Sequence, residues 1–127
     1  MRPLLVGCAL AAVLHLVFAA WGEYFFLETR RAFQVNFTAG ALIGLVLGLL
    51  SPRLAGRDAR EASRAMALLA VPGLLWMAAV ASHVGVFFPA LERGLDKVFG
   101  SWMLWLYGFA LAGALLVEWR ARHRTKK

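Results

Sequence analysis

Two histidines lie inside long uncharged stretches of the sequence, and they are the residues best suited to do chemistry. His15 stands in the run from Pro3 to Gly22, and His83 stands in the run from Ala65 to Leu91. An imidazole can carry a proton or bind a metal ion or haem iron. Ionisable residues within a membrane span are costly to insert, so they are candidates for function.

A pair of histidines on two helices suggests the axial ligands of a b-type haem, and their depths test that idea. Along a helix, His15 lies about 20 Å from Arg2, and His83 lies about 28 Å from Arg64. Ligands that face one haem need nearly equal depth, and this difference disfavours a haem. We therefore expect no cofactor, with haem b kept as an alternative. His15 otherwise forms a neutral hydrogen bond to a neighbouring helix or handles protons, and His83 reaches the membrane interface.

Three further polar residues complete the candidate polar site: Gln34, Asn36 and Glu23. Glu23 directly follows the first uncharged run, and Gln34 and Asn36 lie at the start of the second. The sequence contains no G-x-S-x-G, H-E-x-x-H or P-loop motif, and its uncharged runs contain no paired carboxylates. We predict no catalytic residue and no metal site. The protein is expected not to be an enzyme.

The elements that must position these residues follow from the uncharged runs. The chain of 127 residues is 61% hydrophobic and only 17% charged, and the excess of apolar residues falls into four runs of about 20 residues or more. We predict an all-α polytopic membrane protein, a bundle of four transmembrane helices in one domain, 1–127. The helices are expected at about 3–22, 33–51, 65–88 and 99–119. The first run can also be interpreted as a cleaved signal peptide, although no clear A-x-A site follows it.

The basic residues show which side of the membrane each loop occupies. Ten of the 14 Lys and Arg residues lie at the N-terminus, between the second and third runs, or in the tail 120–127. This bias predicts that both termini are cytoplasmic. The Arg, Ala and Leu-rich composition indicates a bacterial inner membrane protein. The expected partners are anionic lipid headgroups rather than nucleic acid. The candidate contacts are Arg53, Arg57, Arg60, Arg64, Arg120, Arg122, Arg124, Lys126 and Lys127.

Small residues at intervals of four predict close helix packing. Gly40, Gly44 and Gly48 form one ridge in the second run. In lipid such a ridge allows two helix backbones to approach closely. We expect it to contact the first or third helix, or another chain. The same reasoning marks two further pairs, Gly7 with Ala11 and Gly108 with Ala112.

The leading functional prediction is a small, non-catalytic membrane protein that packs against copies of itself or against larger membrane partners, as a subunit or assembly factor. Two alternatives remain open. One is an oligomeric transporter or flippase for a small or lipid-like solute. The other is a membrane anchor subunit linked to haem or quinone.

Overall fold

The computed structural model describes residues 1–25, 29–88 and 95–124. They form helix α1 at Arg2–Phe25, α2 at Arg30–Ala55, a short 3₁₀ helix η1 at Ala59–Glu61, α3 at Ala62–Ser82, α4 at Val84–Phe87 and α5 at Leu95–Arg124. No strand occurs within the described residues. Four helical segments are long and apolar enough to cross a membrane. The prediction of an all-α chain with four membrane-length helices is confirmed.

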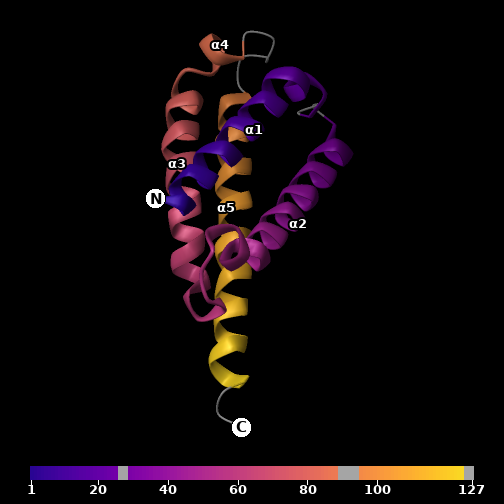
Figure 1. The fold of residues 1–127 in the computed structure, drawn as a ribbon. Helices are drawn as coiled ribbons and strands as arrows, with labels where there is room; N and C mark the ends of the chain where they lie inside the picture. The colour runs from indigo at the N-terminus through magenta and orange to yellow at the C-terminus, as the bar shows by residue number, and fades with distance from the viewer. Residues whose placement is uncertain (26–28, 89–94, 125–127) are drawn as a thin grey trace.

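The four long helices are not packed equally. Helices α3 and α5 lie side by side, α1 packs across α3, and α2 packs along α5 (Figure 1). Helices α1 and α2 diverge from one end of the molecule and make few contacts with each other. Only 17% of the most apolar segment is buried in α1 and in α2, against 39% in the spans that contain α3 and α5. The core therefore lies around α3 and α5.

Helix α2 is longer than predicted at both ends, and local chemistry explains why. The hydroxyl of Thr29 accepts a hydrogen bond from the backbone N–H of Ala32, which caps the first turn. Gly56 ends the helix in the left-handed conformation, with φ of 65°. Pro52 lies inside the helix and cannot donate to the carbonyl of Gly48. The buried Ser51 hydroxyl donates to that carbonyl instead, at 2.8 Å, so the helix continues through the proline.

The prediction of one helix over 65–88 is wrong, because the structure divides this segment. Helix α3 ends at Ser82, and His83 takes a non-helical conformation with φ of −133° and ψ of 37°. Its backbone N–H bonds to the carbonyl of Val80, which tightens the last turn, and α4 then begins at Val84. The break places His83 at a corner between two helices. Phe87, at the end of α4, can consequently turn back toward α1.

Candidate functional site

The glycine ridge of α2 packs against α5 of the same chain, which is a helix that the sequence analysis did not consider. A Cβ atom added to Gly44 or Gly48 would collide with the backbone carbonyl of Leu106 or Ala110. Gly40 lies under the indole of Trp102. We call this contact the α2–α5 seam. The glycines allow backbone-to-backbone approach within one bundle, so this ridge is not available to another chain.

Two tryptophans of α5 form hydrogen bonds with the backbone of α2 at one end of the α2–α5 seam. The indole N–H of Trp102 donates to the backbone carbonyl of Asn36 at 2.9 Å, and that of Trp105 donates to the carbonyl of Phe37 at 3.0 Å. Trp102 is only 1% exposed, whereas Trp105 is 45% exposed. Both bonds use carbonyls in the first turns of α2. They fix the position of α2 on α5 at this end.

The two other small-residue pairs behave differently. Gly7 and Ala11 are buried, and Gly7 lies against the backbone of Leu69 in α3. Gly108 and Ala112 lie on the exposed outer face of α5, where a Cβ at Gly108 would meet nothing within 4 Å. Gly108 and Ala112 therefore contribute no close packing within the described chain.

His15 is surrounded by aromatic rings. Its ring centroid lies 5.6 Å from that of Trp76, 5.9 Å from Phe87 and 5.3 Å from Phe88. The Nδ1 atom is buried and has no hydrogen-bond partner among the described residues. The expected hydrogen bond to a neighbouring helix is thus not present at this atom.

The remaining candidate polar residues do not gather around His15. His83 is exposed, and its Nδ1 lies 3.2 Å from the carbonyl oxygen of Ala79. Gln34 is exposed, and Asn36 contributes its backbone carbonyl to the bond with Trp102. The side chain of Glu23 lies outside the described residues. No three His, Cys, Asp or Glu side chains of the described segments gather as metal ligands would.

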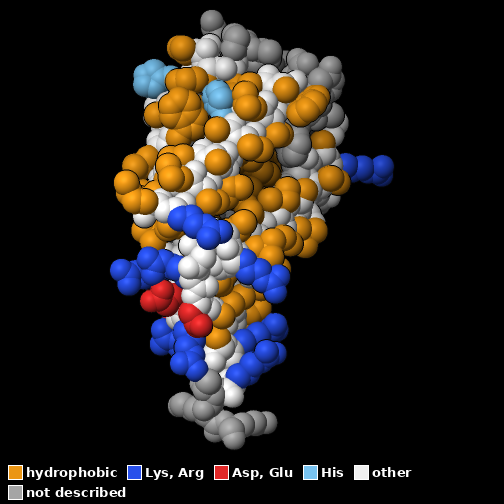
Figure 2. Space-filling model, in the orientation of Figure 1, with side chains coloured by type: hydrophobic (Ala, Val, Ile, Leu, Met, Phe, Trp, Pro, Cys, Tyr) orange, Lys and Arg blue, Asp and Glu red, His pale blue; other side chains and the backbone are white. Residues whose placement is uncertain are grey.

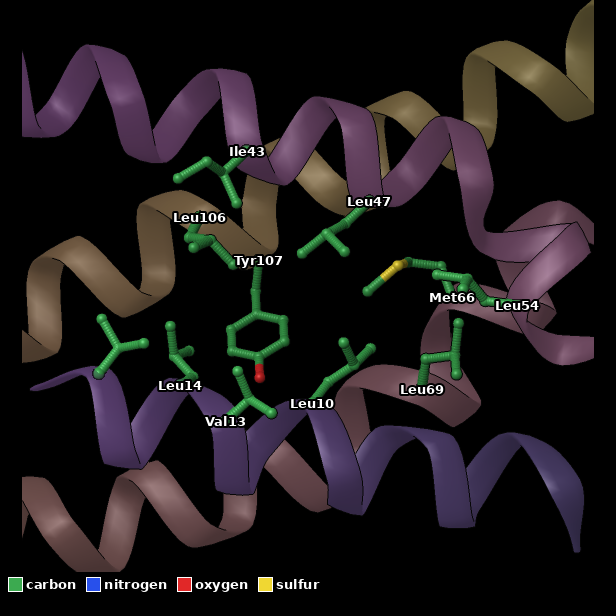
Figure 3. A pocket seen from close by; sticks show the side chains of 11 residues that line it. Leu10, Val13, Leu14, Ile43, Leu47, Leu54, Met66, Leu69, Leu106 and Tyr107 are labelled. Atoms are coloured by element: carbon green, nitrogen blue, oxygen red, sulfur yellow. The ribbon is translucent and has the colours of Figure 1, made fainter.

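A laterally open apolar groove lies where α1 and α2 diverge (Figures 2 and 3), and we call it the α1–α2 groove. Its volume is about 210 Å³. All four long helices line it with eleven side chains, which are apolar except for one hydroxyl: Leu10, Val13, Leu14, Val17, Ile43, Leu47, Leu54, Met66, Leu69, Leu106 and Tyr107.

The rim and the floor of the α1–α2 groove differ in exposure. Val13 on α1 is 59% exposed and Ile43 on α2 is 46% exposed, so the rim faces the surroundings of the bundle. Met66, Leu69 and Leu106 are each 3% exposed or less and close the floor. An apolar cavity of about 150 Å³ is large enough to stay dry and bind benzene. The α1–α2 groove can therefore hold an apolar group of at least that size.

Tyr107 supplies the single hydroxyl of the α1–α2 groove. Its ring projects from α5 into the space between α2 and α1, with the oxygen directed toward α1 near Val13 (Figure 3). The residue is 9% exposed, and Oη has no hydrogen-bond partner among the described residues. A Cβ atom on Gly73 of α3 would overlap Oη, so Gly73 makes room for the phenol. The hydroxyl of Tyr107 is thus a hydrogen-bond donor without a described partner in the otherwise apolar lining of the groove.

Most of the basic side chains visible in Figure 2 surround the end of the molecule that carries the α5 C-terminus, whereas Arg30 and Arg31 lie at the start of α2. Arg57 forms an ion pair with Glu61, and Arg122 forms one with Glu118. Glu118 also accepts hydrogen bonds from the backbone N–H and the hydroxyl of Ser63, which ties α5 to the start of α3. The exposed basic residues at this end include Arg53, Arg60, Arg64, Arg120 and Arg124. Lys126 and Lys127 lie outside the described residues.

Sequence reasoning missed the α1–α2 groove because a groove depends on how two helices diverge. The only available signals were Tyr107, a hydroxyl in the middle of an apolar run, and Gly73, an unexplained glycine next to Pro72. Neither indicates a cavity until α3 and α5 are placed side by side.

Comparison with known proteins gives a family but no activity. No curated protein and no solved structure is significantly similar to the chain. The profile of DUF5367, described as a family of unknown function, matches residues 24–121. This match contains α2, α3, α4 and nearly all of α5, so it includes the α2–α5 seam and the floor of the α1–α2 groove. The chain belongs to the DUF5367 family.

Proposed function

We propose that the protein is a small, non-catalytic integral protein of a bacterial inner membrane, with both termini cytoplasmic, that binds a lipid-like molecule in the α1–α2 groove. The basic residues at the α5 C-terminal end support this orientation, because they favour the cytoplasmic side and its anionic headgroups. A reporter that is active only in the cytoplasm should therefore be active when it is fused to the C-terminus. Activity of a periplasm-dependent reporter would contradict this topology.

The α1–α2 groove is the observation that carries the proposal. It combines a volume of about 210 Å³, an almost wholly apolar lining and an exposed rim. A ligand can enter it sideways from the bilayer without crossing a polar surface. Ligand sites in helical bundles have this character, with apolar walls and few polar groups.

The packing of the bundle favours binding over transport. The floor of the α1–α2 groove is closed by buried residues of α3 and α5, and the α2–α5 seam joins α2 to α5 through backbone contacts. A solute in the groove has no polar path to the opposite side through the described part of the bundle. We therefore place the flippase interpretation behind simple binding.

A matched pair of substitutions on α1 tests the proposal. Val13 lines the α1–α2 groove and is 59% exposed, whereas Leu16 is 65% exposed and does not line it. The full chain is extracted in mild detergent and examined by native mass spectrometry. Wild type and Leu16→Trp should retain a lipid-like molecule, while Val13→Trp fills the groove and should lose it. Equal retention by both variants, or no retention by the wild type, would contradict the proposal.

A second candidate function is a packing subunit of a larger membrane assembly. The outer face of α5 favours it, because Gly108 and Ala112 lie there in a shallow hollow beside Trp105 and Phe109. Small residues at this spacing suit close contact with another helix. Gly108→Leu should then abolish cross-linking to a partner or a second copy. Unchanged cross-linking in that variant would remove this candidate.

A further inference from the structure

We propose that the α1–α2 groove selects a ring-bearing lipid with a carbonyl group, of the isoprenoid quinone class, and that the hydroxyl of Tyr107 donates a hydrogen bond to that carbonyl. This inference rests on the proposed function, since it names the class of molecule that the groove binds. It concerns binding alone and requires no electron transfer.

The first step of the argument is the state of the Tyr107 hydroxyl. Tyr107 is nine-tenths buried and lines the α1–α2 groove, its Oη lies beside Gly73 of α3, and no described residue forms a hydrogen bond with it. A largely buried hydroxyl without a hydrogen-bond partner is unfavourable in an apolar setting. A phenylalanine would fill the same space without this cost. The hydroxyl is therefore explained if a bound molecule supplies the acceptor.

The second step is the depth of the hydroxyl. Tyr107 lies about 15 Å along α5 from Lys97 and about 20 Å from Arg120, which places it near the middle of the span. The ester oxygens of a phospholipid lie at the headgroup region, outside the hydrocarbon core. The acyl chain that reaches this depth carries no acceptor. An ordinary phospholipid consequently leaves Tyr107 without a partner.

The third step is the size and lining of the space beside the hydroxyl. A volume of about 210 Å³ exceeds the benzene-sized cavity of about 150 Å³ that is known to bind a ring. Leu47 and Met66 border this space as purely apolar neighbours (Figure 3). A substituted ring fits within it, with one carbonyl toward Tyr107 Oη. The apolar tail then leaves past the exposed rim at Val13 and Ile43.

The test compares two probes that share a ten-carbon chain, decylubiquinone and decylbenzene, on the purified full chain in detergent micelles. Only the first probe has carbonyl groups. Wild type should bind decylubiquinone about 3- to 10-fold more tightly than decylbenzene, as expected for one hydrogen bond. Tyr107→Phe should lose this preference and keep its affinity for decylbenzene. Ser101→Ala removes an exposed hydroxyl from the same helix and should keep the preference.

The outcomes separate the two claims. Equal affinity of the wild type for both probes would overturn the quinone inference while the proposed binding function stands. A preference that survives Tyr107→Phe would also overturn it, because another group would then be the donor. Binding of neither probe would reject both claims. Infrared spectroscopy gives a readout that needs no variant, since the carbonyl band of bound decylubiquinone should lie at lower frequency than in empty micelles; an unshifted band would contradict the hydrogen bond.

Discussion

The α2–α5 seam and the α1–α2 groove lie on two faces of the same helix, and they show two opposite ways of using side-chain size. In the seam, Gly44 and Gly48 have no side chain, so the backbone of α2 can contact the backbone of α5. In the groove, Ile43 and Leu47 line the space between α2 and α1, where Ile43 stays 46% exposed and Leu47 is only partly buried. Close packing holds α2 on α5, and incomplete packing leaves room beside α1. We infer that stability resides mainly in the seam and binding in the groove.

The largest expected effect comes from adding one methyl group to the α2–α5 seam. Gly48→Ala places a Cβ against the carbonyl of Ala110, so the two backbones must separate. We expect the free energy of unfolding in detergent micelles to fall by about 2–3 kcal/mol. Gly108→Ala is the matched control, because its Cβ meets nothing within 4 Å. It should be neutral or stabilising by up to about 1 kcal/mol. Equal losses in both variants would show that the seam is not special.

A smaller effect is expected from the tryptophans at the end of the α2–α5 seam. Trp102→Phe removes the donor to the carbonyl of Asn36 from a fully buried position. The loss should be about 1–2 kcal/mol in the free energy of unfolding. Trp105→Phe removes a similar bond from a half-exposed position and should cost less than Trp102→Phe. The reverse order would show that exposure does not govern these two bonds.

The hydroxyl that supports Pro52 gives the next smaller effect. Ser51 is fully buried and donates to the carbonyls of Gly48 and Ala62. Ser51→Ala leaves both without this donor and should lower the free energy of unfolding by about 1 kcal/mol. Ser82→Ala removes an exposed hydroxyl that bonds to Ala78, and should change it by less than about 0.5 kcal/mol. Equal thermal unfolding of the two variants would contradict the role given to Ser51.

The sequence predicted the apolar helices well, because the length and composition of a membrane span are properties of a local segment. It also found the glycine ridge, since a repeat of four residues is visible without a structure. It did not find that the ridge contacts α5, because the choice among helices depends on the tertiary arrangement. The break at His83 was missed for a similar reason. The run over 65–88 carries no charged residue, and its two polar residues, Ser82 and His83, do not by themselves mark a corner.

The candidate site was predicted less well than the fold. Sequence reasoning selected His15, which lies among aromatic rings, and His83, which is exposed. It did not select Tyr107, whose hydroxyl became a candidate only when its surroundings were known. A polar residue within an apolar run has a meaning that depends on its partners. Those partners come from helices that are distant in the sequence.

Photolabelling of the full chain in lipid nanodiscs tests the central claim, that the α1–α2 groove is a binding site, most directly. The probe is a ten-carbon chain with a diazirine group, and the labelled residues are located by mass spectrometry. Labelling of groove residues such as Leu47 should saturate with probe concentration and disappear in Val13→Trp. Labelling of Leu104, which is 70% exposed on α5, should rise in proportion to probe. Groove labelling that also rises without saturation would mean that the groove holds only bulk lipid, and would contradict the claim.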